Sequence, residues 1–233
     1  MIGFHARAIR KSYGKRLILD LDLHFESRGL HVILGPNGCG KSTLLKLLAL
    51  QESPDQGDIL LLEDGQDLEK DRSNRQRIVL TPQPGGLFND TVRNNAAYGL
   101  KVRNVARKER TEGIDAVLSA VGLSPLGGAN ALTLSSGEKQ RLCMAMAMAV
   151  TPDVILLDEP TSSLDPHNVQ QVEAIIADMK RERRMIILVT HNISQARRLA
   201  DSVTFMATDR AVVQSPAAEF FANFDEDGLD GYL

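Results

Sequence analysis

The sequence predicts an α/β fold with a mostly parallel core sheet, and two patterns support this prediction. Short apolar runs, each followed by a turn signal and a helical pattern, begin at His31, Ile78, Val154 and Met185. Unbroken apolar runs of this kind are typical of strands buried on both faces. Amphipathic helical patterns lie between them, for example at 114–121 and 169–179. Strands that alternate with helices favour a parallel sheet.

A second layer is predicted near the N-terminus. Strand patterns with few helices between them occur at 3–9, 17–25 and 57–62. They indicate a small antiparallel β layer. Residues 84–133 are mostly helical in pattern, so we expect a helical insertion there, and Asp165 with Pro166 resembles the start of a later helix. A length of 233 residues suits one large domain. We therefore predict a single domain over 1–233, with a helical subdomain inserted at about 84–150.

Composition and charge narrow the class of partner. Lys and Arg number 27 against 30 Asp and Glu, which gives a formal charge of −3. A nucleic-acid binder is expected to show a basic excess instead, so we expect no nucleic-acid partner. The two cysteines, Cys39 and Cys143, form neither a metal-type C-x-x-C spacing nor an evident disulfide framework. This favours a reducing, cytosolic compartment.

The ends of the chain and its hydropathy bear on location. The start of the sequence lacks the charged and apolar regions of a signal peptide, and no stretch approaches the roughly 18 apolar residues that span a bilayer. We therefore expect a chain that is not exported and does not cross a membrane by itself. The acidic stretch at 225–230 is typical of a solvated, partly disordered end.

A phosphate-binding motif, G-x-x-x-x-G-K-[ST], follows a strand pattern and precedes an apolar helical pattern, as this motif requires. Its residues are Gly35, Pro36, Asn37, Gly38, Cys39, Gly40, Lys41 and Ser42, and Thr43 is included in the predicted nucleotide site. Glycines let backbone N–H groups converge on an anion, and the helix N-terminus adds partial positive charge. Lys41 would contact the β- and γ-phosphates of a nucleotide, and Ser42 would offer its hydroxyl to Mg²⁺. The chain is therefore predicted to be a P-loop NTPase.

Two consecutive acidic residues, Asp158 and Glu159, end the apolar run that begins at Val154. A carboxylate at the end of a buried strand is costly unless it meets a cation. Asp158 is therefore predicted to lie on the metal side of the nucleotide, while Glu159 can orient or polarise the attacking water. Taken alone, the two acids could instead cap the turn at Pro160.

Further motifs resemble those of the ABC-type ATPases and occur in that family's order. They are the signature at 134–138, the D-loop at 159–165, the switch histidine His191, the Q-loop at 81–83 and the adenine-stacking Tyr13. Each has an ordinary alternative by itself, such as a surface aromatic, a solvated loop residue or a helix-capping histidine. Their order and spacing across 13–191 outweigh those alternatives, so the resemblance covers nearly all of the chain.

The resemblance implies a mechanism with ATP and Mg²⁺. In this family two ATPase domains face each other head to tail, and each ATP lies between the P-loop of one and the signature of the other. Ser135 and Gly137 would then face the γ-phosphate in trans, and Asp165 would organise the dimer seam. The implied catalytic set is Lys41, Gln83, Glu159 and His191, and the implied metal ligands are Ser42, Gln83 and Asp158.

The signature departs from the family pattern at two positions. Ser136 stands where the family has a second glycine, and Glu138 stands where it has glutamine. If position 136 needs a positive φ, serine costs about 1 kcal/mol or more, whereas otherwise the change is tolerable. Glu138 adds negative charge near a nucleotide. Cys39 is a further departure, since a low-pKa thiol at a helix N-terminus is open to alkylation, unless its side chain points away and is unreactive.

Three functions are compatible with an ATPase of this kind. The first is a transporter subunit at the cytoplasmic face of the inner or plasma membrane, bound to separate transmembrane permease subunits and served by a solute-binding protein. Residues 87–100 resemble importers of oxyanions, including tungstate, and also importers of other small solutes. The second is a soluble ABC ATPase acting in translation or DNA repair, but such proteins usually carry two cassettes or a long coiled-coil insertion. The third, a nucleotide kinase, leaves 134–138 and His191 unexplained.

Overall fold

The computed structural model describes residues 1–181, 184–207 and 211–224. These residues form two compact units. The first, here called the sheet unit, comprises Met1–Leu80, Asp153–Glu159 and the described part of Met179–Leu233. The second, the helical unit, comprises Thr81–Pro152 and Pro160–Asp178. A single domain over 1–233 with its helical subdomain at about 84–150 stays a prediction, and the acidic stretch at 225–230 lies outside the described residues.

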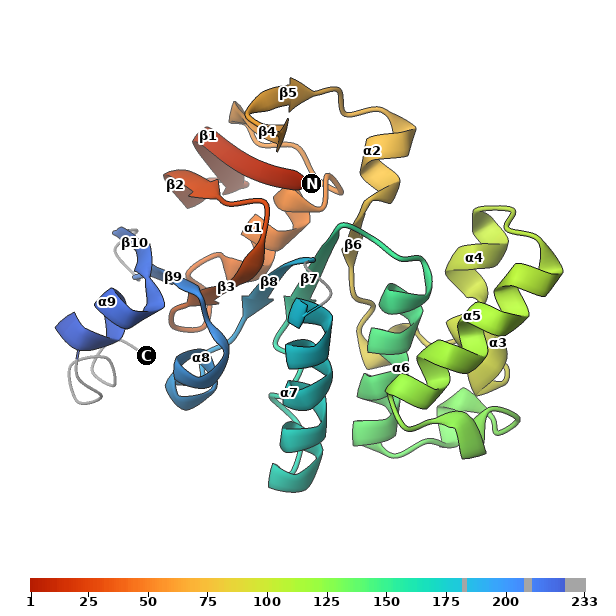
Figure 1. Ribbon diagram of the computed structural model, residues 1–233. Coiled ribbons are helices and arrows are strands. Elements are labelled where there is room, and N and C mark those ends of the chain that lie inside the picture. The colour runs from red at the N-terminus through yellow and green to blue at the C-terminus, as the bar shows by residue number, and fades with distance from the viewer. Residues whose placement is uncertain (182–183, 208–210, 225–233) are drawn as a thin grey trace. The chain divides into compact units, whose positions relative to one another are not determined.

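The sheet unit contains the predicted antiparallel layer, which is confirmed (Figure 1). Its strand order is β2 (Arg16–Phe25), β1 (Ile2–Tyr13), β4 (Gln56–Glu63) and β5 (Gln66–Leu68). Along β2, the buried residues Leu19, Leu21, Leu23 and Phe25 alternate with exposed polar ones. This alternation gives the layer one apolar face, because successive side chains of a strand point to opposite sides.

The second sheet of this unit has the predicted parallel strands. Its order is β10 (Val212–Pro216), β9 (Ser202–Met206), β3 (Gly29–Leu34), β8 (Met185–Val189), β7 (Val154–Asp158) and β6 (Ile78–Leu80). All neighbouring strands from β9 to β6 pair in parallel, and β10 pairs with β9 in the antiparallel direction. Parallel pairing brings the carboxyl ends of β3, β7 and β8 to one edge, where ligand sites of open α/β sheets occur.

The core of the sheet unit includes helix α1 (Lys41–Leu48) and side chains from both sheets. Four leucines of α1 are fully buried, namely Leu44, Leu45, Leu47 and Leu48. Burial of each leucine contributes about 1.5–3 kcal/mol, so the helix that follows the phosphate motif is fixed by its apolar face. Other helices of the unit are α2 (Arg72–Gln76), α8 (Ile193–Leu199) and α9 (Ala217–Asn223).

The helical unit is built around α6 (Ser136–Ala149), which α3 (Val92–Ala96), α4 (Tyr98–Val102) and α5 (Arg107–Ala120) all contact. Short 3-10 helices lie at Pro84–Gly86, Ser124–Leu126 and Ala131–Thr133. Helix α7 (Pro166–Arg181) begins as predicted, because the Asn168 amide donates to Asp165 Oδ1 at 3.1 Å. Within the described residues, no helix has the length and apolar character needed to cross a membrane.

Candidate nucleotide-binding site

The phosphate motif forms the loop between the end of β3 and the start of α1, and two of its glycines lie where a side chain would not fit. Gly35 and Gly40 have φ values of 153° and 107°. A Cβ at Gly35 would lie 2.3 Å from the Met206 carbonyl oxygen, and one at Gly40 would lie 2.6 Å from Leu19 Cδ2. Both positions therefore need glycine for space as well as for backbone conformation. Asn37 and Gly38 complete the exposed turn of the loop.

Lys41 places a buried positive charge inside this loop. Its side chain is 5% exposed, and its ammonium donates hydrogen bonds to the carbonyl oxygens of Gly35 at 2.6 Å and Pro36 at 2.9 Å. These bonds hold the ammonium against the backbone of the phosphate loop itself. Lysine and the following helix N-terminus thus supply positive potential at one place, which suits an anionic ligand.

The side chains of Ser42 and Asp158 place two oxygen atoms that can act as metal ligands close together at the edge of the parallel sheet. The Ser42 hydroxyl donates to Asp158 Oδ1 at 3.1 Å. Burial raises the pKa of the Asp158 carboxyl above its ordinary value, and the hydrogen bond from Ser42 opposes that shift. No cluster of three or more His, Cys, Asp or Glu side chains suited to a metal occurs in the described residues. A single carboxylate with a hydroxyl fits Mg²⁺, which is commonly completed by water and phosphate oxygens.

Glu159 has a left-handed backbone conformation, with a φ of 48°. A non-glycine residue in this region costs about 1–2 kcal/mol. The conformation is held by a hydrogen bond from the Glu159 amide to the Val189 carbonyl on β8, at 3.0 Å. The turn of the chain here directs two consecutive carboxylates to different partners. Asp158 contacts Ser42, whereas Glu159 Oε2 lies 3.0 Å from His191 Nδ1.

Tyr13 ends strand β1 and presents a ring that is 47% exposed. Its hydroxyl donates to Glu52 Oε2 at 2.6 Å, and this bond raises the pKa of the phenol. The hydroxyl also interacts with the side chain of Thr43 in the first turn of α1, and Lys11 Nζ lies 5.5 Å from the ring centroid. Tyr13 is thus anchored beside the phosphate loop. Its stacking on adenine stays a prediction.

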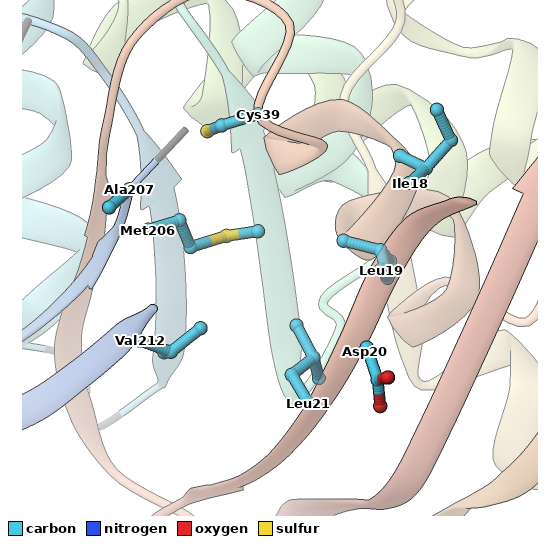
Figure 2. Close-up of a pocket in the computed structure, with 8 residues that line it drawn as sticks. All are labelled: Ile18, Leu19, Asp20, Leu21, Cys39, Met206, Ala207 and Val212. Atoms are coloured by element: carbon cyan, nitrogen blue, oxygen red, sulfur yellow. The ribbon is translucent and has the colours of Figure 1, made fainter. Parts of the chain in front are cut away.

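Cys39 has the environment of an unreactive thiol. Figure 2 shows Cys39 beside Met206 and Ala207 at a cavity of about 10 Å³, which is barely enough for one water molecule. Burial raises the pKa of the Cys39 thiol, although the positive charge of Lys41 opposes this effect. Of the two possibilities raised by the sequence, the structure therefore favours the thiol that is not activated.

The signature begins helix α6 with a capping box formed by Ser135 and Glu138. The Ser135 amide and hydroxyl both donate to Glu138 Oε2, at 2.8 and 2.7 Å, and the Glu138 amide donates to Ser135 Oγ at 3.4 Å. These bonds lower the pKa of the Glu138 carboxyl. Ser136 is the first residue of the helix and is not among the described residues with positive φ. The cost considered for serine at this position therefore does not arise.

Gly137 is in close contact with the helix that follows the D-loop. A Cβ at Gly137 would lie 2.1 Å from Asn168 Oδ1. Asn168 also donates to Asp165 Oδ2 at 2.6 Å and accepts from Arg141 Nη1 at 3.0 Å. Asn168 thus connects the signature helix to the D-loop aspartate. Sequence reasoning missed this residue, although its position three residues after an N-cap aspartate is a signal of local hydrogen bonding.

The predicted site residues are distributed between the two units. Within the sheet unit the structure brings Ser42 to Asp158 and Glu159 to His191. The signature residues and Gln83 belong to the helical unit. Gln83 precedes the 3-10 helix at Pro84–Gly86 and its side chain is exposed. Its role as a catalytic residue and metal ligand stays a prediction.

Comparison with known proteins identifies the family. Residues 18–162 match the family described as ABC transporter. The chain is 36% identical to the tungstate uptake system ATP-binding protein TupC of Peptoclostridium acidaminophilum, over 87% of this chain and 93% of that protein. It is 40% identical to the phosphate import ATP-binding protein PstB 2 of Natronomonas pharaonis, over 83% of this chain and 72% of that protein.

A solved structure has the same fold. The cbiO1 protein of Clostridium perfringens, described as part of the ABC transporter complex cbiONQ, aligns with a TM-score of 0.83 and 27% identity. The alignment covers 97% of this chain and 92% of that one, which confirms the predicted α/β P-loop NTPase fold. Since the family match also spans more than half of the sequence, this chain belongs to the ABC transporter family as an ATP-binding, ATP-hydrolysing member.

Proposed function

We propose that this chain is the ATPase subunit of an importer for a small oxyanion, with Mg²⁺ as its cofactor. The observation that carries the catalytic part is the left-handed backbone at Glu159, which separates the contacts of Asp158 and Glu159. One carboxylate is thereby available on the metal side and the other on the side of the attacking water. Two adjacent acids with separate tasks suit phosphoryl transfer to water, where positioning and electrostatic stabilisation supply most of the catalysis.

Each of the predicted catalytic and metal-binding residues has a task in this proposal. Lys41 would bind the β- and γ-phosphates, and Ser42 and Asp158 would hold Mg²⁺. Gln83 of the Q-loop is proposed as a further metal ligand. When bound, Mg²⁺ supplies positive charge that neutralises the phosphate oxygens. Glu159 orients and polarises the attacking water. His191 fixes the Glu159 carboxylate through its 3.0 Å contact and reaches toward the γ-phosphate.

The signature acts on a second copy of the chain. Ser135 and Gly137 contact the γ-phosphate bound to the partner, where Ser135 and the N-terminus of α6 supply hydrogen-bond donors. ATP then joins two copies head to tail, and Asp165 lies at their seam. Hydrolysis removes the bridging γ-phosphate and shifts the population toward the open pair.

The transport role comes from the relatives. The two relatives compared above are named for tungstate uptake and phosphate import, and both solutes are tetrahedral oxyanions. We propose tungstate or a related oxyanion as the solute, separate permease subunits as the membrane partners, and a solute-binding protein outside. The chain would work at the cytoplasmic face of the membrane. These names favour transport over the alternative of a soluble ATPase in translation or DNA repair.

The catalytic proposal is tested with Glu159→Gln in the purified chain. Glutamine keeps the shape of the side chain but cannot take up a proton, so Mg-ATP turnover should fall by at least about 10²-fold while ATP binding persists. Sedimentation should then show an ATP-dependent dimer. Glu112→Gln, at an exposed position of α5, is the matched control and should behave as wild type. Unchanged turnover in Glu159→Gln would refute the assigned role.

The solute is tested in proteoliposomes that contain the complete transporter with its permease and binding protein. ATP turnover should rise when the binding protein carries tungstate or phosphate, and not when it carries an amino acid. Stimulation by a non-oxyanion alone would refute the oxyanion proposal. The Glu159→Gln transporter serves as the control for uptake that does not depend on hydrolysis.

A further inference from the structure

A cavity of about 200 Å³ lies in the helical unit, and its lining includes none of the residues predicted for the nucleotide site. Its lining comes from α3, α4 and α5 and includes four cationic side chains, Arg93, Lys101, Arg107 and Arg110. Its apolar floor is formed by Ala97 and Ile114, which are 8% and 1% exposed. The cavity lining therefore combines two buried apolar residues with four cationic side chains.

The spacing of residues on α5 explains how the wall forms. Arg107, Arg110 and Ile114 are separated by three and four positions, so they share one face of the helix. Glu109 and Glu112 lie roughly 200° and 140° around the helix from Arg107, at about 100° per residue. The carboxylates of α5 nearest in sequence to the two arginines are thus turned away from the cavity.

The charges on the lining are not balanced. Among the described residues that line the cavity, none is a carboxylate. Arg93 pairs with Asp115 at 2.6 Å, and Lys101 Nζ donates to Asn94 Oδ1 at 3.3 Å. For Arg107 and Arg110 the described part of the chain supplies no carboxylate partner. Like charges that converge on one cavity repel each other, and a bound anion would relieve that repulsion.

We propose that this cavity binds a small, divalent tetrahedral oxyanion of the phosphate class. Guanidinium groups match the geometry of such anions and form paired, charge-assisted hydrogen bonds with them. A volume of about 200 Å³ is below the roughly 300–1,000 Å³ of sites for drug-sized ligands, which favours a small anion over a nucleotide. Phosphate and tungstate share this chemistry. The proposal does not depend on the transport role, because only α3–α5 form the site.

The test is a calorimetric titration of the full chain with sodium phosphate and, separately, sodium tungstate at low ionic strength. Because the P-loop also attracts anions, the titrations are carried out in a Lys41→Ala background. The cavity variant adds Arg107→Gln and Arg110→Gln, which keep good helix formers on α5. The matched control instead adds Lys15→Gln and Lys108→Gln, which remove the same charge at exposed positions outside the lining. Circular dichroism and thermal melting verify that both variants fold.

We expect the Lys41→Ala chain to bind at least one of the two oxyanions. Binding should weaken by about 10-fold or more in the cavity variant. The reason is that the anion loses hydrogen bonds to charged guanidinium groups, and such bonds contribute at least about 10-fold to affinity. It should change little in the matched control. A preference for tungstate or for phosphate identifies the ligand. The proposal is overturned if the Lys41→Ala chain binds neither anion, or if the cavity variant and the matched control bind equally well.

Discussion

The Glu159 carboxylate oxygen Oε2 lies 3.0 Å from Nδ1 of His191, although 32 residues separate the two in sequence. An ionised carboxylate only accepts hydrogen bonds, so Nδ1 carries the proton and donates it. The bond therefore selects the tautomer of His191, and it also fixes the direction of the Glu159 side chain. Glu159 is held through its side chain and through its backbone, because its amide also donates to the Val189 carbonyl oxygen.

Replacing His191 by alanine should slow ATP hydrolysis by about 10²-fold, since Glu159 loses the partner that orients it toward water. The side chain of His191 is 49% exposed, so the melting temperature should change little. Steady-state turnover and nucleotide affinity are measured together, and turnover should fall much more than affinity. His24→Ala, on the exposed side of β2, is the control. A matching loss of nucleotide affinity would argue against a positioning role.

Glu138→Gln should strengthen the ATP-dependent dimer proposed above. In the present sequence the Glu138 carboxylate accepts the Ser135 hydroxyl hydrogen at 2.7 Å, so this donor is engaged within its own chain. A neutral amide accepts less strongly by about 1 kcal/mol, which corresponds to roughly 5-fold in affinity. The capping box itself survives, because glutamine also serves at this position.

The measurement is sedimentation of the Glu159→Gln chain with ATP, with and without Glu138→Gln. Glu138→Ala removes the carboxylate half of the capping box and keeps the backbone amide that Ser135 accepts from. It separates helix stability from the hydroxyl effect and should lower the melting temperature. An equal dimer affinity with glutamate and glutamine would show that Glu138 does not compete for the Ser135 hydroxyl.

Gly137→Ala should destabilise the chain by about 1 kcal/mol, because Asn168 must move away from the new methyl group and give up hydrogen bonds, while the better helix propensity of alanine offsets part of that loss. Asn168→Ala should also destabilise it, through the loss of hydrogen bonds to Asp165 and Arg141. The double variant is the informative one. Removing the side chain that clashes should make it more stable than the sum of the two single changes predicts. Urea denaturation of the four chains measures this coupling, and strict additivity would contradict the contact.

Alkylation of Cys39 should be slow at neutral pH. Burial raises the thiol pKa above its ordinary value, so the reactive thiolate is scarce at pH 7 and becomes more abundant only in alkaline solution. Cys143, whose pKa is raised to about 12, should react still more slowly. Mass spectrometry after N-ethylmaleimide treatment follows both sites, and the urea-unfolded chain provides the fast reference. Rapid modification of folded Cys39 at pH 7 would contradict the assignment.

The free energy of unfolding should depend on pH through the carboxyl group of Glu63. Hydrogen bonds from Arg77 and the N-terminal amine lower the pKa of this carboxyl to about 2, from an ordinary value near 4.5. A lowered pKa stabilises the folded chain above the unfolded-state value, and the contribution disappears as the pH falls toward 2. Glu63→Gln should therefore be less stable than wild type at pH 6, with a difference that shrinks below pH 4.5. Chemical denaturation of both chains at pH 6 and at a pH below 4.5 tests this prediction. Glu69→Gln, at an exposed position, is the control.

The order of motifs and the strand patterns were sufficient to predict the fold class. Local signals are the apolar runs at β3, β7 and β8 and the alternation along β2. They are local because the pattern of successive apolar and polar residues indicates whether a strand is buried on one face or on two. The phosphate loop is equally local. Its glycines are needed within one turn of chain, so the spacing alone predicts both the loop and the helix after it.

The two strands that follow the switch histidine in the chain, β9 and β10, have weaker signals in the sequence. Strands β9 and β10 were not predicted by residue range. Strand β10 carries Gln214 and Ser215 with little apolar alternation, which is typical of an edge strand. Its place in the sheet comes from pairing with β9.

By itself, the sequence determined the P-loop, the two carboxylates after β7 and the order of the signature, D-loop and switch motifs. Only the tertiary structure decided that Glu159 takes a left-handed backbone, that its carboxylate meets His191, and that Asn168 packs on Gly137. The physical reason is the range of the interactions. Hydrophobic periodicity and turn chemistry act between near neighbours in sequence, whereas these contacts join residues about 30 positions apart and form only when the strands and helices pack.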